Sequence, residues 1–86
     1  MLETRTLPIA SIRVPVKRQR TLDPDKVSAL AEDMLENGQK TPIQCRADPK
    51  DGGQSFILVE GYHRLEAARA LGETEIKAYL VQARVR

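Results

Sequence analysis

Four stretches of the chain predict β-strands: residues 4–9, 41–47, 55–60 and 75–81. The first, second and fourth alternate hydrophobic and polar residues, as half-buried strands do. The first stretch contains Pro8, which favours the edge of a sheet because proline cannot donate to a hydrogen-bond ladder. The third is the most apolar, so we expect it to be central. Residues 48–54, between the second and third stretches, are rich in Asp and Gly and indicate a hairpin turn.

Two other stretches repeat apolar residues at the spacing of an α-helix. Asp23 is a suitable N-cap and Pro24 fits the first helical position, so we expect a helix from there to Asn37. Its apolar stripe consists of Val27, Leu30, Ala31, Met34 and Leu35. The second helix is expected to begin near Tyr62 and to end at Gly72. Its buried face consists of Leu65, Ala68 and Leu71.

The segment between the first strand and the first helix is predicted to be mostly irregular. Residues 10–12 are expected to form a single helical turn or bend. Residues 13–20 show no helical period, and they carry cations but no acid: Arg13, Lys17, Arg18 and Arg20. Because Pro15 disfavours helix just before it, we expect an exposed basic loop. Arg84 and Arg86 are expected to form a frayed basic tail.

The predicted elements define an α+β fold, in which a small mixed sheet of about four strands packs against two main helices. A chain of 86 residues has room for one small core, so residues 1–86 are expected to form a single domain.

Composition narrows the cellular setting. The sequence has no apolar stretch near the ~20 residues that a membrane span needs, and its polar N-terminus does not resemble a signal peptide. We therefore expect a cytoplasmic protein without a membrane partner. The single cysteine, Cys45, and the single histidine argue against a disulfide and a zinc site. Cys45 is expected to act as a small hydrophobe. A net charge of +2 is by itself too small to predict nucleic-acid binding.

The strongest candidate for chemistry is the run Gly61-Tyr62-His63-Arg64, where a predicted strand ends, a glycine turns and a helix begins. A helix start presents unpaired backbone N–H groups and a partial positive charge. His63 and Arg64 add an imidazole and a fixed cation, so the run predicts an anion site, with phosphate as the best candidate. The alternative for His63 is a structural role as a cap or buried partner.

This run, together with the helix that follows it and Gly72, resembles the signature shared by the ParB N-terminal domain and sulfiredoxin. The segment from Leu22 to Val27, its helix, and Thr41-Pro42-Ile43 resemble the middle of both families. Together these motifs cover most of the chain from Ile9 to Val81. The resemblance implies a ParB/sulfiredoxin-like fold and a nucleotide ligand, with ATP, ADP or CTP as the candidates.

The resemblance also implies roles for particular residues. Gly61, His63 and Arg64 would hold the nucleotide phosphates, and Lys26 would lie near the nucleotide. A basic residue placed over the ligand in both families corresponds to one of three arginines: Arg13, Arg18 or Arg20. Tyr62 is expected to pack in the core or to contact the base. For Lys26 and the basic loop the alternative is ordinary solvated surface.

Two departures from these families change the expected function. Sulfiredoxin carries its nucleophilic cysteine directly before the His-Arg pair, where this chain has Tyr62, and a phenol cannot replace a thiolate in the chemistry of a sulfinic acid. We therefore expect no sulfiredoxin activity. ParB proteins carry a helix-turn-helix domain after this region, and the 86 residues end before one could fit. We therefore also expect no ParB-like DNA-specificity module.

Three functions follow from these observations. The leading hypothesis is a stand-alone nucleotide-binding module, regulatory and with a link to DNA, in which ordering of the basic loop over a phosphate changes the surface offered to a protein partner. The second is a phosphotransferase, NTPase or nuclease, which requires a metal such as Mg²⁺ and a general base. The candidates for the base are Glu60, Glu66 or an acid of the first predicted helix, and the alternative for Glu60 and Glu66 is an ordinary solvated carboxylate. The third is a non-specific DNA-binding adaptor. All three hypotheses are compatible with a monomer or a homodimer.

Overall fold

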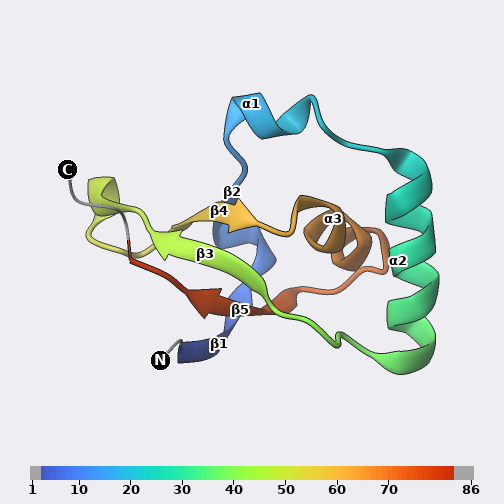
Figure 1. The fold of residues 1–86 in the computed structure, drawn as a ribbon. Coiled ribbons are helices and arrows are strands. Elements are labelled where there is room, and N and C mark those ends of the chain that lie inside the picture. Colours follow the sequence, from blue (N-terminus) through green and yellow to red (C-terminus); the bar gives the residue numbers. More distant parts are fainter. Residues whose placement is uncertain (1–2, 83–86) are drawn as a thin grey trace.

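The computed structural model describes residues 3–82, which form a five-stranded mixed sheet with three α-helices (Figure 1). The strands are β1 (Glu3–Pro8), β2 (Ile12–Arg13), β3 (Ile43–Ala47), β4 (Phe56–Glu60) and β5 (Glu75–Leu80). The helices are α1 (Val16–Gln19), α2 (Pro24–Asn37) and α3 (Tyr62–Ala70). Two short 3₁₀ turns, η1 (Ile9–Ser11) and η2 (Pro49–Asp51), complete the order of elements. The predicted α+β class is confirmed.

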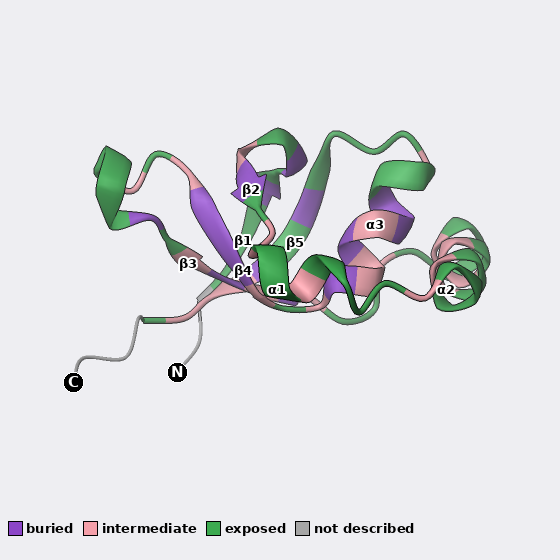
Figure 2. Cartoon of the chain, turned by 90° about the horizontal axis from the view of Figure 1, so that it is seen from above, coloured by how far each residue is buried: buried purple, intermediate pink, exposed green. Residues whose placement is uncertain are grey.

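The sheet has the strand order β1-β5-β3-β4-β2. β3 and β4 form the expected antiparallel hairpin, β1 is antiparallel to β5, and β3 runs parallel to β5. β1 and β2 are consecutive in the chain but lie at opposite edges of the sheet, and only the three residues of η1 join them. The sheet is therefore strongly curled, as the view from above shows (Figure 2).

The N-terminal third of the chain differs most from the sequence-based expectation. A fifth strand, β2, pairs in parallel with β4 through only two residues, which is too short to produce an alternating pattern. The predicted loop of residues 13–20 contains the four-residue helix α1, which begins directly after Pro15. Proline disfavours helix before itself but is compatible with a helix that starts after it. The expected turn at residues 10–12 is η1, one residue earlier.

The hydrophobic core lies between the concave face of the sheet and α3. Every strand contributes to it, and α3 contributes Tyr62, Leu65 and Ala68. Leu65 and Ala68 were predicted, whereas Leu71 of the predicted buried face follows the end of α3 and is only partly buried. The strand expected to be central, β4, has strands on both sides, but β3 occupies the middle of the five. Cys45 of β3 is completely buried in this core as a free thiol, in agreement with the expected role of a small hydrophobe.

Helix α2 begins at the predicted cap, where the Asp23 carboxylate accepts a hydrogen bond of 3.0 Å from the backbone N–H of Asp25. However, α2 has no buried residue, because it packs on α3 and lies at the side of the molecule (Figures 1 and 2). The predicted apolar stripe is consequently only half covered: Met34 packs against the core, whereas Leu35 is 75% exposed. No helix within residues 3–82 combines the length and apolarity that crossing a bilayer requires.

Gln39, in the connection after α2, continues the hydrogen bonding of the sheet with its side chain. The Gln39 amide donates to the carbonyl oxygen of Lys77 at 2.9 Å and accepts from the backbone N–H of Lys77 at 2.8 Å. The same amide nitrogen also donates to the Thr41 carbonyl oxygen at 3.0 Å. The pairing of β3 with β5 begins at Ala78, so β3 has no residue paired with Lys77. The side chain of Gln39 forms the backbone hydrogen bonds of Lys77 in its place.

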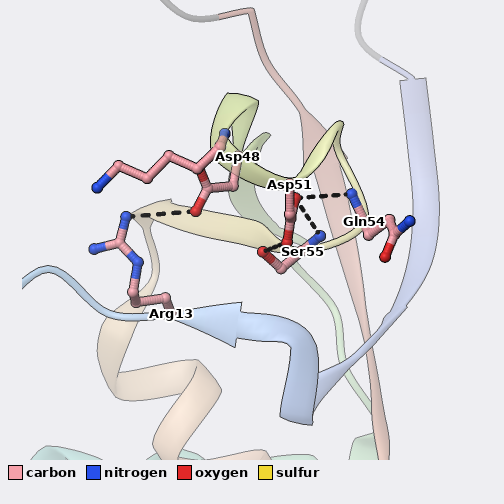
Figure 3. Close-up of polar contacts among 6 residues, drawn as sticks. Arg13, Asp48, Asp51, Gln54 and Ser55 are labelled. Atoms are coloured by element: carbon pink, nitrogen blue, oxygen red, sulfur yellow. Dashed lines mark hydrogen bonds and ion pairs between the residues drawn. The ribbon is translucent and has the colours of Figure 1, made fainter.

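Two aspartates fix the turn between β3 and β4 (Figure 3). Asp48 is buried, caps η2 through the backbone N–H of Lys50, and pairs with Arg13 of β2 at 3.7 Å. Asp51 accepts hydrogen bonds from the backbone N–H groups of Gln54 and Ser55. The predicted turn chemistry of residues 48–54 is therefore confirmed, and one predicted site residue, Arg13, contacts this turn from β2. The predicted tail residues Arg84 and Arg86 lie outside the described residues.

Candidate functional site

The candidate site begins at Gly61, which lies between the end of β4 and the start of α3. Its backbone has φ +103°, a conformation that side-chain-bearing residues rarely adopt. A Cβ atom at this position would lie 2.7 Å from Cγ2 and 2.9 Å from Cβ of Ile43 in β3. The absence of a side chain therefore allows β3 to approach the start of α3 closely.

Gly61 also leaves the first turn of α3 without a side-chain cap. It occupies the N-cap position, and no side-chain hydrogen bond caps the helix there. The N–H groups of a first turn have no acceptor within their own helix, and they carry the positive end of the helix dipole. The start of α3 therefore has the backbone geometry that the sequence predicts for an anion site.

A pocket of about 390 Å³ lies at this helix start. It is lined by residues of α3, of the end of β4, of α2 and of the segment around α1: Arg18, Thr21, Leu30, Glu60, Gly61, Tyr62, His63 and Arg64. Five of the eight residues predicted for the site are thus brought together, and Arg18 is the arginine of the basic segment that reaches the pocket. Thr21 and Leu30 were not predicted as site residues, because they line the pocket only through tertiary packing and the local sequence pattern does not reveal such packing.

Two arginines supply the positive charge of the pocket, and their surroundings differ. Arg64 forms no ion pair or hydrogen bond with another side chain within residues 3–82, so its guanidinium can accept an anion. Arg18 donates to the carbonyl oxygen of Val59 and, at 3.0 Å, to the carboxylate of Glu60. This hydrogen bond and the charge of Arg18 lower the pKa of Glu60 below its ordinary value.

His63 has the structural contact that was the alternative to phosphate binding, and it also lines the pocket. Its Nε2 accepts a hydrogen bond of 3.0 Å from the backbone N–H of Asp23, the N-cap residue of α2. An accepting Nε2 is unprotonated, so the remaining proton of the neutral ring lies on Nδ1. His63 therefore links the starts of α2 and α3, and it also lines the pocket.

Tyr62 belongs to the hydrophobic core, with 9% of its surface exposed, and its ring centroid lies 6.1 Å from that of His63. The structure thus favours packing, the first of its two predicted roles. Tyr62 directly precedes His63 and Arg64, which is where the resemblance to sulfiredoxin would place the cysteine of that family. Cys45 lies on β3, and burial raises the pKa of its thiol to about 11, which keeps it protonated at neutral pH.

The remaining three predicted residues are not in the pocket lining. Lys26 and Arg20 are exposed. Arg13 lies on β2 and pairs with Asp48. Two of the candidate general bases are also ion-paired, Glu60 with Arg18 and Glu66 with Arg69 at 3.2 Å. Within residues 3–82, no three His, Cys, Asp or Glu residues gather into a group that could hold a metal ion.

Comparison with known proteins identifies relatives that share this fold and belong to several functional classes. Residues 1–86 match the ParB N-terminal domain family. Sulfiredoxin from Arabidopsis thaliana is 28% identical with a TM-score of 0.80, over 94% of this chain and 86% of that protein. The chromosome-partitioning protein ParB from Caulobacter crescentus, complexed with CTP-γ-S, is 23% identical with a TM-score of 0.81, over 95% of this chain.

A free serine kinase variant in complex with AMP is 16% identical with a TM-score of 0.77, over 93% of this chain. The chain spans only 46% of the ParB protein and 31% of the kinase. No protein with a curated function matched the sequence. These likenesses confirm the ParB/sulfiredoxin-like fold.

Proposed function

The chain belongs to the ParB N-terminal domain family, and from this premise we propose that it binds a nucleotide by its phosphates at the start of α3. The observation that carries the proposal is Gly61. Its positive φ and its contact with Ile43 leave no room for a side chain, and the uncapped N–H groups of α3 open into a pocket that contains Arg18 and Arg64. Backbone donors and a helix dipole beside arginine are the usual components of a phosphate site.

The hydrogen-bond donors of the pocket have distinct tasks in this proposal. The first N–H groups of α3 donate to phosphate oxygens, and Arg64 neutralises their charge through its planar guanidinium. The Nδ1–H of His63 is a further donor, while Nε2 keeps the ring in place through Asp23. Arg18 closes the pocket from the side of α1. The fold of β4 and α3 thus positions the donors before the ligand arrives.

Two relatives support the choice of ligand, because a ParB protein with this fold was crystallised with CTP-γ-S and a serine kinase with AMP. ATP, ADP and CTP are accordingly the candidate ligands, and each brings a polyphosphate of several negative charges. Regulation is the use we propose for the site, since the pocket is lined by residues of three separate segments, α1, α2 and α3, which a ligand would contact together.

Isothermal titration calorimetry with ATP, ADP and CTP, each with and without Mg²⁺, tests the proposal. Arg64→Gln should weaken nucleotide binding by about tenfold or more, because a charge-assisted contact to phosphate is lost. Arg69→Gln is the matched control, since Arg69 lies on the same helix but pairs with Glu66 outside the pocket. Absence of binding by the wild type, or equal losses in both variants, would contradict the proposal.

We also propose that the chain lacks sulfiredoxin activity. Tyr62 stands in the position of the nucleophile, and Cys45 is fully buried on another strand with a protonated thiol. Neither side chain can form the thiolate that attacks a sulfinic acid derivative. An assay for ATP-dependent reduction of a peroxiredoxin sulfinic acid should give no product with the wild type. Product formation would show that this proposal is wrong.

A further inference from the structure

The pocket contains one acidic residue, and its position bears on which ligands the pocket can accept. Glu60 lies directly before Gly61, and its carboxylate pairs with Arg18 at 3.0 Å. Arg18 and Glu60 both line the pocket where the uncapped helix start and Arg64 are found. An anion held at the start of α3 therefore meets an arginine that already has an anionic partner within the same chain.

Arg18 is also the residue that connects α1 to the sheet. Helix α1 has no buried residue, and Val16 at its start is 73% exposed. Among the side chains of α1 within the described region, the hydrogen bonds that reach distant residues come from Arg18, whereas Gln19 bonds to the nearby Val14 carbonyl oxygen. The position of α1 beside the pocket thus depends on the contacts of Arg18 with Val59 and Glu60.

The ion pair between Arg18 and Glu60 is weak enough to exchange partners. The side chains are 36% and 67% exposed, respectively, and exposed pairs of this kind contribute little because water and salt screen them. Glu60 brings a single negative charge. A polyphosphate brings several charges and can present two oxygens to the guanidinium, which gives shorter and stronger hydrogen bonds.

We infer that Glu60 is a competing internal anion that occupies Arg18 in the absence of ligand, so that only anions of higher charge, such as the polyphosphate of a nucleoside di- or triphosphate, displace it efficiently. This inference rests on the proposed phosphate site. It assigns Glu60 a role in ligand selection that differs from a general base or a metal ligand, because Glu60 opposes binding. Singly charged anions, including carboxylates, gain too little from Arg18 to replace Glu60.

Glu60→Gln separates these roles, because glutamine keeps the size and an oxygen acceptor for Arg18 but removes the charge. Binding of ADP and of inorganic pyrophosphate is measured by calorimetry for the wild type, Glu60→Gln and Glu66→Gln. Glu66→Gln is the control for net charge, since it removes an equivalent carboxylate that pairs with Arg69 outside this pocket. Glu60→Gln should bind both probes more tightly, by up to about fivefold, as expected for the loss of a weak exposed competitor.

The outcomes distinguish the inference from the function on which it rests. Tighter binding in Glu60→Gln, with Glu66→Gln close to the wild type, supports it. If the wild type binds but Glu60→Gln binds equally or more weakly, the inference is wrong and the phosphate site stands. Equal tightening in both variants shows a general charge effect and also overturns the inference. If neither the wild type nor Glu60→Gln binds, the phosphate site and the inference fail together.

Discussion

At the scale of single residues, two independent constraints favour glycine at position 61: the positive φ and the closeness of Ile43. Another glycine of the chain is subject to the first constraint alone and serves as a control. Gly72 has a similar positive φ of +78°, but a Cβ there would have nothing within 4 Å. Gly61 has the positive φ and the contact with Ile43 as well. Comparing substitutions at Gly61 and Gly72 should therefore separate the cost of the backbone conformation from the cost of steric overlap with Ile43.

Gly61→Ala should reduce the free energy of unfolding by about 2–4 kcal/mol, because strained backbone and steric overlap both contribute. Gly72→Ala should lose about 1 kcal/mol, since only the backbone term applies. Urea unfolding followed by circular dichroism measures both values. Similar losses in the two variants would show that Ile43 moves aside without cost.

The pair between Arg18 and Glu60 predicts a small dependence of stability on pH. Arg18 holds the pKa of Glu60 below its ordinary value of 4.5. The pair therefore stabilises the fold above pH 4.5, and its contribution is lost as the pH falls through the lowered pKa. Because Glu60 is exposed and Arg18 is only partly buried, this contribution stays below about 1 kcal/mol.

Arg18→Gln should return the pKa of Glu60 toward 4.5, and the difference in stability from the wild type should disappear at lower pH. NMR titration of the Glu60 side-chain carboxyl carbon measures the shift. Lys17→Gln is the control, because Lys17 lies on the same helix without an ion pair to Glu60. An unchanged Glu60 pKa in Arg18→Gln would mean that the ion pair does not form in solution.

At the scale of elements, the well-marked helix boundaries could be predicted and the short elements could not. Asp23 and Pro24 identify the start of α2 because capping is a local interaction. The extent to which its stripe is buried depends on what α2 packs against, so the 75% exposure of Leu35 could not be read from the spacing. β2 and α1 are set by contacts with distant residues, and Arg13 and Arg18 were therefore indistinguishable as site candidates.

We predict that the side chain of Gln39 stabilises the start of β5. Gln39→Ala removes both hydrogen bonds to the backbone of Lys77, and it should cost about 1–2 kcal/mol. Amide hydrogen exchange should accelerate at Lys77 more than at the centre of β5. Gln54→Ala is the control, since the Gln54 side chain forms no hydrogen bond within the described residues. Equal exchange in both variants would show that water replaces Gln39 without loss.

At the scale of the whole molecule, Cys45 reports on opening of the complete sheet. It is fully buried on the central strand β3, and it is the single cysteine of the chain. Its thiol has a pKa raised to about 11. At pH 8 the low thiolate fraction alone should slow its reaction with a disulfide reagent by about a hundredfold relative to the unfolded chain. Rapid labelling under native conditions would contradict this burial.

The overall architecture was more predictable than the contents of the pocket. The apolar periodicity of the strands and helices and the glycine between β4 and α3 predicted the α+β fold, because these signals are local in sequence. The pocket wall formed by Thr21 and Leu30 and the pairing of Glu60 with Arg18 require residues about 30 to 40 positions apart to meet. Contacts between residues so far apart in sequence are determined by the tertiary structure and not by the local sequence pattern.

The curl of the sheet also constrains how the chain folds. β1 has β5 as its one neighbour in the sheet, and the two pair from Glu3 with Leu80 to Pro8 with Glu75. The first and last strands must therefore find each other across almost the entire described chain, and contacts of such long sequence separation slow folding. During synthesis β5 follows every other described element. Leu7, which the finished sheet buries, consequently lacks its partner strand until translation has passed Leu80, so β1 can pair with β5 only after every other described strand has been synthesised.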